Sequence, residues 1–426
     1  MTTFEETAIL QLPAGLTIAP FDTGAAEQQY ILILPDGRHF RLTPYMYQFI
    51  QCIDGKRNVA EIAAILEKNW GRDVRAEQVW QMAQHHLGNY GLLVSGNGGS
   101  APPPLPSNRA DRIFSWHVAL FSPQRIEPLT RLGQFFFTWP VAVLSLIGVA
   151  LTYLVIYVDA NATWRQWAQS LGESDFILVY ALVILSVLWH EIGHASACRR
   201  FGVEYGTIGL GIYLIFPVFY ADVTRIWRLT RWQRVLVDLG GIYFQLWVAI
   251  VYYLIYLLSG SHIFLLAVIN ISLLILVTFN PLVKFDGYWI VSDVLGIPNL
   301  HRRLGETIKR LWSRQQQTSL VLKPWGQVGL TLYLICFIWL TIALLIQMVG
   351  NAGAFTEQIT MTIMTNVNSI LLGWQTADWR VIGAALLRLI SPGITLIGLA
   401  LLLLRGLRLL GQHISVRRKS PAASHS

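Results

Sequence analysis

Two histidines, His190 and His194, lie four residues apart and are well placed to bind one metal ion. On an α-helix, residues with this spacing lie on one face, so both imidazoles can reach the same ion. Glu191 completes the pattern HExxH, in which its carboxylate can take a proton from water at the metal. Zinc suits this chemistry because it lowers the pKa of a bound water to about 7. The spacing therefore predicts a zinc site with Glu191 as its general base.

A catalytic zinc commonly takes three protein ligands, so HExxH leaves one ligand to be found elsewhere. Asp286 is the best candidate, because an ionisable residue in an apolar stretch is a functional-site candidate by default. It follows the apolar segment over 263–283, which we expect to end on the same side of the membrane as the segment that carries HExxH. The alternative is an interfacial aspartate paired with Lys284 or with a basic residue of a loop.

The composition indicates a membrane protein. The 426 residues are 54% hydrophobic and only 13% charged, with a mean hydropathy of +0.48. A soluble chain would be nearer one quarter charged, so we expect a mainly α-helical, polytopic membrane protein with a small soluble part. About six segments reach the length of about 20 apolar residues that a bilayer requires. They cover 136–158, 176–199, 234–258, 263–283, 327–349 and 381–404.

Basic residues gather on one side of these six segments. They are concentrated before the first segment, between the second and third, after the fourth and after the sixth, whereas the opposite loops are mainly acidic. The positive-inside rule then places both termini in the cytoplasm. The same distribution accounts for most of the net charge of +8, which would otherwise suggest nucleic-acid binding.

Residues 1–95 are expected to form a small α+β domain that resembles a winged helix. Two strands flank Pro35-Asp36-Gly37, and the second of three following helices begins with a capping box between Asn58 and Glu61. A Gly/Pro-rich linker over 96–112 and a membrane domain over 113–426, with its core at 176–300, follow. The predicted strands cover 30–34 and 38–42, and the predicted helices cover 45–52, 58–70 and 76–91.

Three shorter features also carry predictions. The stretch 206–220 is apolar but too short to span, so we expect a re-entrant or strand-like insert on the cytoplasmic side. The stretch 361–374 is expected to lie in the outer interface. Arg234 and Asp238 have the spacing of an ion pair along one helix.

Around the two candidate motifs, the sequence resembles the site-2 protease family of intramembrane zinc metalloproteases over about 176–300. In that family the third zinc ligand lies in the pattern N-x-x-P-x-x-x-x-D-G. Pro281 matches its proline and Asp286-Gly287 match its D-G, while Thr278 stands at the position of its asparagine. The segments FPVFYADVTRIWRLTRWQR and FDGYW are similar to the bacterial branch linked to peptide maturation and export.

This resemblance implies roles for individual residues. Asn280, two residues after Thr278, and Gln245, at the asparagine of the family's G-P-x-x-N, are implied to bind substrate. The stretch 206–220 is implied to pair with an extended substrate strand. The implied zinc ligands are His190, His194 and Asp286, and the implied general base is Glu191.

The N-terminal region resembles the PqqD-like family over about 30–94, chiefly through LTPYMYQFIQCIDGKRNVAEIAAIL. Such domains bind leader peptides of ribosomally made, modified peptides, so the resemblance implies a peptide-binding role. The alternative is a generic winged-helix regulatory domain. DNA binding is not expected, because the helix over 76–90 carries no cluster of Arg or Lys.

These features imply a zinc endopeptidase in the inner membrane of a bacterial cell. It would cut a peptide or a single-span membrane protein at the cytoplasmic side, in the maturation or export of a ribosomally made peptide. The lipid bilayer and an exporter or adaptor protein would be its other partners, and nucleic acid would not. Two alternatives stay open: a non-catalytic membrane component of a peptide export or efflux assembly, and a regulated intramembrane protease of a transmembrane signalling protein.

Overall fold

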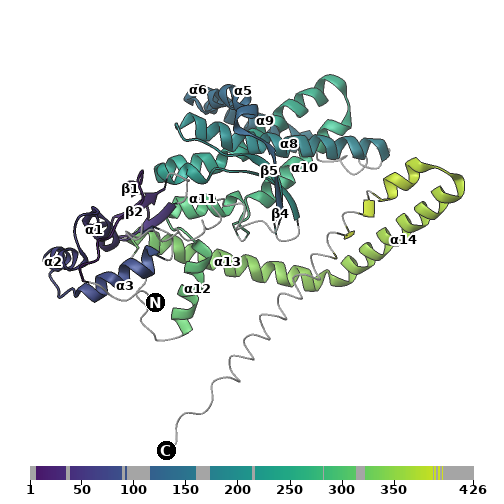
Figure 1. The fold of residues 1–426 in the computed structure, drawn as a ribbon. Coiled ribbons are helices and arrows are strands. Elements are labelled where there is room, and N and C mark those ends of the chain that lie inside the picture. The colour runs from purple at the N-terminus through teal and green to yellow at the C-terminus, as the bar shows by residue number, and fades with distance from the viewer. Residues whose placement is uncertain are drawn as a thin grey trace, which may run out of the picture. The chain divides into compact units, whose positions relative to one another are not determined.

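The part of the chain that the structure describes is mainly helical and contains two small β-sheets (Figure 1). The chain divides into two compact units: one joins Met1–Leu210 to Phe219–Ile335, and the other joins Gly211–Val218 to Cys336–Ser426. The computed structural model describes residues 6–34, 39–88, 92–93, 116–159, 173–213, 216–281, 283–312 and 322–386, together with 388–389, 392–393 and 396.

A three-stranded antiparallel sheet in the order β1-β2-β3 opens the first unit. Thr17 pairs with Ile33, and Tyr30 pairs with Leu42. The predicted hairpin strands and the three predicted helices are confirmed, and β1 is an additional strand that the pattern did not indicate. The last helix ends at His86, and the predicted linker over 96–112 lies outside the described residues. The elements are β1 (Thr17–Phe21), β2 (Gln29–Ile33), β3 (His39–Leu42), α1 (Pro44–Cys52), α2 (Val59–Trp70) and α3 (Ala76–His86).

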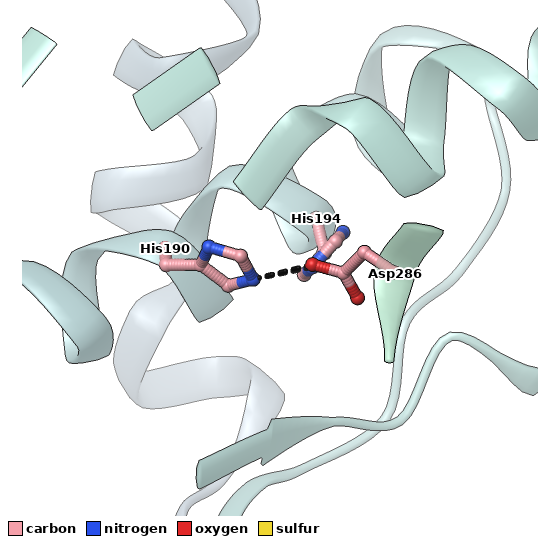
Figure 2. Close-up of side chains that lie close together, drawn as sticks. All are labelled: His190, His194 and Asp286. Atoms are coloured by element: carbon pink, nitrogen blue, oxygen red, sulfur yellow. Dashed lines mark hydrogen bonds and ion pairs between the residues drawn. The ribbon is translucent and has the colours of Figure 1, made fainter. Parts of the chain in front are cut away.

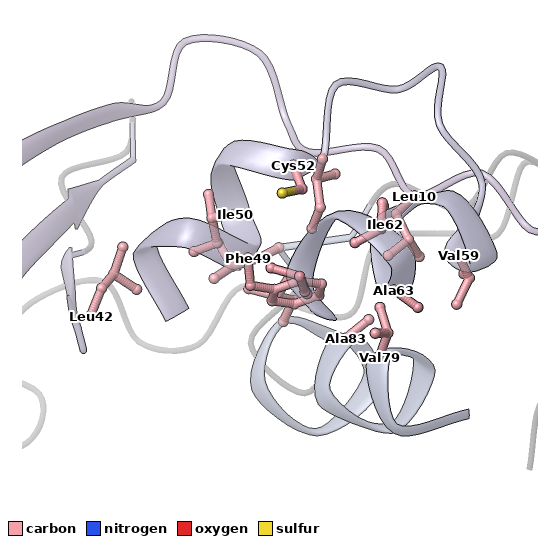
Figure 3. Close-up of a cluster of buried hydrophobic side chains, with 14 of the residues drawn as sticks. Leu10, Leu42, Phe49, Ile50, Cys52, Val59, Ile62, Ala63, Val79 and Ala83 are labelled. Atoms are coloured by element: carbon pink, nitrogen blue, oxygen red, sulfur yellow. The ribbon is translucent and has the colours of Figure 1, made fainter. Parts of the chain in front are cut away.

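Helix α2 organises the core of this N-terminal region. Asn58 Oδ1 accepts from the Glu61 amide at 2.8 Å, and Glu61 Oε2 accepts from the Asn58 amide at 3.0 Å, so the predicted capping box is present. Apolar side chains then recur along one face of α2 and are buried against α1, α3 and the sheet (Figure 3). Fully buried members of this cluster include Leu32, Phe49, Val59, Ile62, Leu66 and Val79.

Within the described residues, three helices are long and apolar enough to cross a membrane: α6 (Trp139–Asp159), α8 (Glu173–Arg200) and α9 (Arg231–Ser259). Two shorter apolar helical stretches, α10 (His262–Thr278) and the Pro324–Trp339 part of α13 (Pro324–Gly350), coincide with further predicted spans. The predicted segment over 381–404 lies mostly outside the described residues. The membrane character is therefore supported, and the predicted number of six spans is not confirmed.

Helices α8 and α9 approach each other through glycines. A Cβ added at Gly193 on α8 would overlap the backbone of Gly240 on α9, and a Cβ at Gly240 would lie 2.9 Å from the Gly193 carbonyl oxygen. Small residues at such a crossing let two backbones come close, which is typical of helices in membranes. The crossing brings the HExxH turn of α8 against the N-terminal half of α9.

The predicted insert over 206–220 is strand-like, as expected. It forms β5 (Ile208–Tyr213) and β6 (Phe216–Ala221), which join β4 (Trp116–Phe121) in a sheet of order β4-β5-β6. Ile208 and Ala221 pack against Ala195 on α8, so the sheet supports the helix that carries HExxH. The other elements are α5 (Pro123–Gly133), the 3₁₀ turns η2 (Gln134–Phe137) and η3 (Thr224–Arg228), α11 (Asp286–Leu295), α12 (Leu300–Trp312) and α14 (Ala352–Thr376), which includes the stretch 361–374.

A buried arginine links the N-terminal sheet to the helices that carry the candidate site. Only 1% of Arg234 on α9 is exposed. Its Nε donates to Asp293 on α11 at 2.8 Å, and its other nitrogens donate to the carbonyl oxygens of Leu229 at 2.9 Å and Asp22 at 3.0 Å. Its guanidinium also lies 5.0 Å from the ring centroid of Phe21 at the end of β1. A buried guanidinium with these partners fixes the register between β1, α9 and α11.

Candidate metal centre

Figure 2 shows three side chains, His190, His194 and Asp286, that converge from α8 and the start of α11. Asp286 Oδ2 lies 2.8 Å from His190 Nε2 and 3.5 Å from His194 Nε2. The two Nε2 atoms lie 3.0 Å apart. Both histidines are more than nine-tenths buried, and the side chain of Asp286 is 20% exposed. The structure therefore brings together the three residues that the sequence predicts as metal ligands.

The hydrogen-bond partners of the two Nδ1 atoms indicate where the imidazole protons lie. His194 Nδ1 is 2.8 Å from the carbonyl oxygen of Val237, which can only accept, so Nδ1 carries the proton. His190 Nδ1 is 3.0 Å from Gln245 Oε1 and donates to it in the same way. Each Nε2 then presents a lone pair to the other and to the Asp286 carboxylate. Three electron-pair donors this close repel one another unless a metal ion or an additional proton lies between them.

The spacing of the three ligand atoms is compatible with a zinc ion. Zn–N distances of about 2.0–2.1 Å put the ligand atoms of a tetrahedral site about 3.3 Å apart. The three distances between the ligand atoms, from 2.8 to 3.5 Å, bracket that value. Asp286 Oδ2 is buried, and its close polar neighbours among the described residues are the two Nε2 atoms. Two imidazoles and one carboxylate are also a known donor set of catalytic zinc sites.

Two glycines make room for this centre. Gly241 on α9 faces the imidazoles so closely that an added Cβ would overlap Nε2 of both His190 and His194. Gly287, directly after Asp286, lies so near the backbone of Phe279 at the end of α10 that a Cβ there would overlap its carbonyl group. In the segment between α10 and Asp286, the Pro281 carbonyl oxygen accepts a hydrogen bond from the Tyr333 hydroxyl of α13 at 2.7 Å. The loop that presents Asp286 is thus held from both sides.

Replacing Gly241 with alanine should therefore weaken zinc binding by about tenfold or more, because the methyl group would occupy the space between the ligands. Zinc affinity can be measured by competition with a chelator in detergent. Gly305→Ala on α12 is the matched control, because nothing lies within 4 Å of a Cβ there. Wild-type zinc affinity in a folded Gly241→Ala protein would contradict this description of the site.

The predicted general base, Glu191, is 7% exposed and lies beside the cluster on α8. Its carboxyl group interacts with the backbone amide of Ala221, the last residue of β6. Because it follows His190 directly, it lies about 100° around the helix from that residue, next to the face that the two histidines share, and its carboxyl group interacts electrostatically with His190, His194 and Asp286. Its position agrees with the predicted role, which stays a prediction.

The two predicted substrate-binding residues lie in different settings. Asn280 is half-buried in the turn after α10, and Thr278 before it donates its hydroxyl to the Leu274 carbonyl oxygen of its own helix at 2.9 Å. Gln245 is 1% exposed and accepts from His190 Nδ1. Neither contact tests substrate binding. The carbonyl of Val237 was not predicted as part of the site, because every residue has one and the sequence carries no signal for it.

The contact of Gln245 predicts a positioning role. Gln245→Leu keeps a similar volume but removes the acceptor at His190 Nδ1, and it should weaken zinc binding by about 10- to 100-fold. Gln245→Glu keeps an acceptor and should retain affinity closer to that of the wild type. Chelator competition measures both. If Gln245 instead acts only on substrate, Gln245→Leu will raise KM and leave zinc affinity unchanged.

One curated protein with a described activity is similar to part of this chain. It is the "Putative peptide zinc metalloprotease protein YydH" of Bacillus subtilis (strain 168), which is 24% identical over 147 residues. The match covers 33% of this chain and 52% of that protein, so the chain spans about half the length of this relative. No protein-family model and no solved structure matches the chain. The similarity supports a relationship to metalloproteases, a coarser assignment than the site-2 type that the motifs predict.

Proposed function

We propose that this protein is an intramembrane zinc endopeptidase of the site-2 type that acts on a peptide. The observation that carries the proposal is the convergence of His190, His194 and Asp286, whose possible ligand atoms lie close together. They lie on and beside an apolar helix that is long enough to cross a membrane. The similarity to a protein named as a peptide zinc metalloprotease supports the same reaction class.

A zinc ion held by these three residues would supply a Lewis acid and lower the pKa of water at the site. Glu191 would take a proton from the attacking water and pass it to the leaving amine. Its near-complete burial restricts bulk water around the carboxylate. The Ala221 amide holds the carboxyl group in place from the strand side. This chain's own contribution is thus a buried base beside three preorganised ligands.

The sheet suggests how an extended peptide reaches this base. Strand β6 lies at an edge of the sheet β4-β5-β6, and its last residue, Ala221, contacts Glu191. A substrate strand that pairs along the Phe219–Ala221 end of β6 would run toward Glu191. Backbone pairing makes little demand on side chains, so it suits a peptidase whose substrate must be unwound before cleavage.

The proposal is tested with the full chain reconstituted in liposomes and incubated with a peptide library, with cleavage products identified by mass spectrometry. We expect discrete internal cleavages that disappear with a zinc chelator and return when zinc is added. Products that persist in the chelator, or terminal trimming alone, would exclude a zinc endopeptidase.

A second candidate is a non-catalytic component of a peptide export or efflux assembly. Thr278 favours it, because its hydroxyl is bound to its own helix where the resembled family has an asparagine for substrate. In that case Glu191→Gln would leave export of the partner peptide at the wild-type level. The third possibility, a protease of a transmembrane signalling protein, predicts that Glu191→Gln captures a single-span protein rather than a small peptide.

A further inference from the structure

A pocket with two arginines in its lining lies where the N-terminal sheet meets the loop after α11. Gln29 at the start of β2 and Arg41 on β3 form one side, and Gly296 and Arg303 of the α11–α12 region form the other. Leu322, just before α13, completes the wall. None of the described residues that line the pocket is acidic. The pocket thus draws on segments that are distant in the sequence, and its lining includes no residue of HExxH.

Backbone hydrogen bonds fix the walls of this pocket. The Gly24 amide donates to the Gly296 carbonyl at 2.8 Å, and the Lys323 amide donates to the Gly24 carbonyl at 2.9 Å. Ala25 and Leu322 form an antiparallel bridge. Gly296 has φ +61°, and a Cβ there would overlap the Gly24 nitrogen, so only glycine allows this close approach. The pocket is therefore part of a defined junction.

Positive charge is concentrated at this junction. Arg303 NH1 lies 3.3 Å from Glu306 Oε2, and Arg302 Nε lies 3.0 Å from Glu306 Oε1, so two guanidinium groups share one carboxylate. Arg41 is the third guanidinium. Partial burial and the nearby Arg303 and Arg302 lower the pKa of Arg41, while Glu306 acts in the opposite direction. The group of three arginines is thus incompletely neutralised by Glu306 and would gain from a bound anion.

A buried hydrogen-bond acceptor in the pocket sets a second requirement for a ligand, in addition to negative charge. Gln29 is 1% exposed, and its Nε2 donates to the Glu27 carbonyl oxygen at 3.5 Å, which orients the amide. Its Oε1 is buried and has no hydrogen-bond donor among the described residues. A buried acceptor without a partner costs stability, so a ligand that donates a hydrogen bond here would recover that cost. A simple carboxylate has no such donor.

We propose that this pocket binds a phosphate group with an adjacent hydroxyl donor. The phosphate oxygens would accept from Arg41 and Arg303, and the hydroxyl would donate to Gln29 Oε1. Inorganic phosphate and the headgroup of phosphatidylglycerol share this chemistry. The ligand would join β3 of the N-terminal region to α12 and so stabilise their contact. This site does not depend on the peptidase activity proposed above.

The first test measures binding of radiolabelled inorganic phosphate to the full-length protein in detergent. We expect saturable binding that weakens by about tenfold in Arg303→Gln and in Arg41→Gln, because each removes charge-assisted hydrogen bonds. The matched control is Arg302→Gln, which removes the same charge from the next residue, outside the pocket lining. It should change binding by about twofold at most. Equal losses in all three variants would indicate non-specific attraction and overturn the site.

A second test separates the two sources of phosphate. The melting temperature is measured in nanodiscs of phosphatidylcholine with or without phosphatidylglycerol, and in phosphatidylcholine with or without phosphate at constant ionic strength. A rise with phosphatidylglycerol that Arg303→Gln abolishes would identify a lipid headgroup, and a rise with phosphate alone would identify a soluble phosphate compound. No rise in the melting temperature with either phosphatidylglycerol or phosphate would overturn the proposal.

Discussion

Glu191→Gln is expected to lower peptide cleavage by about a thousandfold, because general acid–base catalysis contributes about 10² to 10⁴. Glutamine has nearly the same shape and can keep the contact with the Ala221 amide, but it cannot take a proton from water. Zinc content and the unfolding temperature should stay at wild-type values, because Glu191 is not among the three converging ligands. The measurement is the initial rate of cleavage of a peptide identified in the liposome assay, with zinc per chain determined on the same samples.

A matched control comes from Glu127, an exposed carboxylate on α5 that pairs with Arg199 at 3.3 Å. Glu127→Gln should cleave at the wild-type rate, because a surface pair contributes little to stability. Wild-type turnover by Glu191→Gln would remove this residue from the mechanism. Loss of zinc in Glu191→Gln would show that Glu191 maintains the structure of the metal site and would leave its role in proton transfer without support.

Asp286→Ala and His194→Ala are each expected to weaken zinc binding by about 100-fold or more, because each removes one of three ligands. Purified wild-type protein should hold about one zinc per chain, and both variants should lose most of it on dialysis. Elemental analysis gives the zinc content, and circular dichroism checks that the helices remain.

The controls for this experiment are His86→Ala and Asp73→Ala, which remove the same residue types from exposed positions of the N-terminal region. Both should retain zinc. Zinc at the wild-type level in Asp286→Ala, with loss in His194→Ala, would mean that the third ligand lies elsewhere and that Asp286 is a neighbour of the site. Loss in both would show that α8 and the start of α11 form one centre.

Local rules predicted much of the N-terminal region. The hairpin strands, the three helices and the reciprocal cap between Asn58 and Glu61 follow from turn residues, apolar periodicity and capping chemistry, which act within a few residues. Strand β1 was missed, because a short strand with weak alternation is recognised chiefly by its pairing with β2. The predicted number of six membrane spans is not confirmed. One of the predicted spans corresponds to α10, which is only 17 residues long, whereas a bilayer requires about 20.

The tertiary structure selected partners that spacing alone would not choose. The interval of four residues favours Asp238 as the partner of Arg234, yet the guanidinium donates at 2.8 Å to Asp293, which is 59 residues away. Spacing along the chain also gives no reason to pair His190 Nδ1 with Gln245, or His194 Nδ1 with the Val237 carbonyl oxygen. Helix packing decides such contacts, and no periodicity within one helix encodes them.

The sequence by itself determined the chemistry that is available to this protein. The HExxH spacing places two imidazoles on one helical face, and Asp286 could be singled out as an ionisable residue beside an apolar segment. Only the tertiary structure decided that these groups meet, with Oδ2 of Asp286 at 2.8 and 3.5 Å from the two Nε2 atoms. The physical reason is the close glycine crossing of α8 and α9 and the close approach of Gly287 to the Phe279 backbone, which bring distant backbones within the reach of one ion.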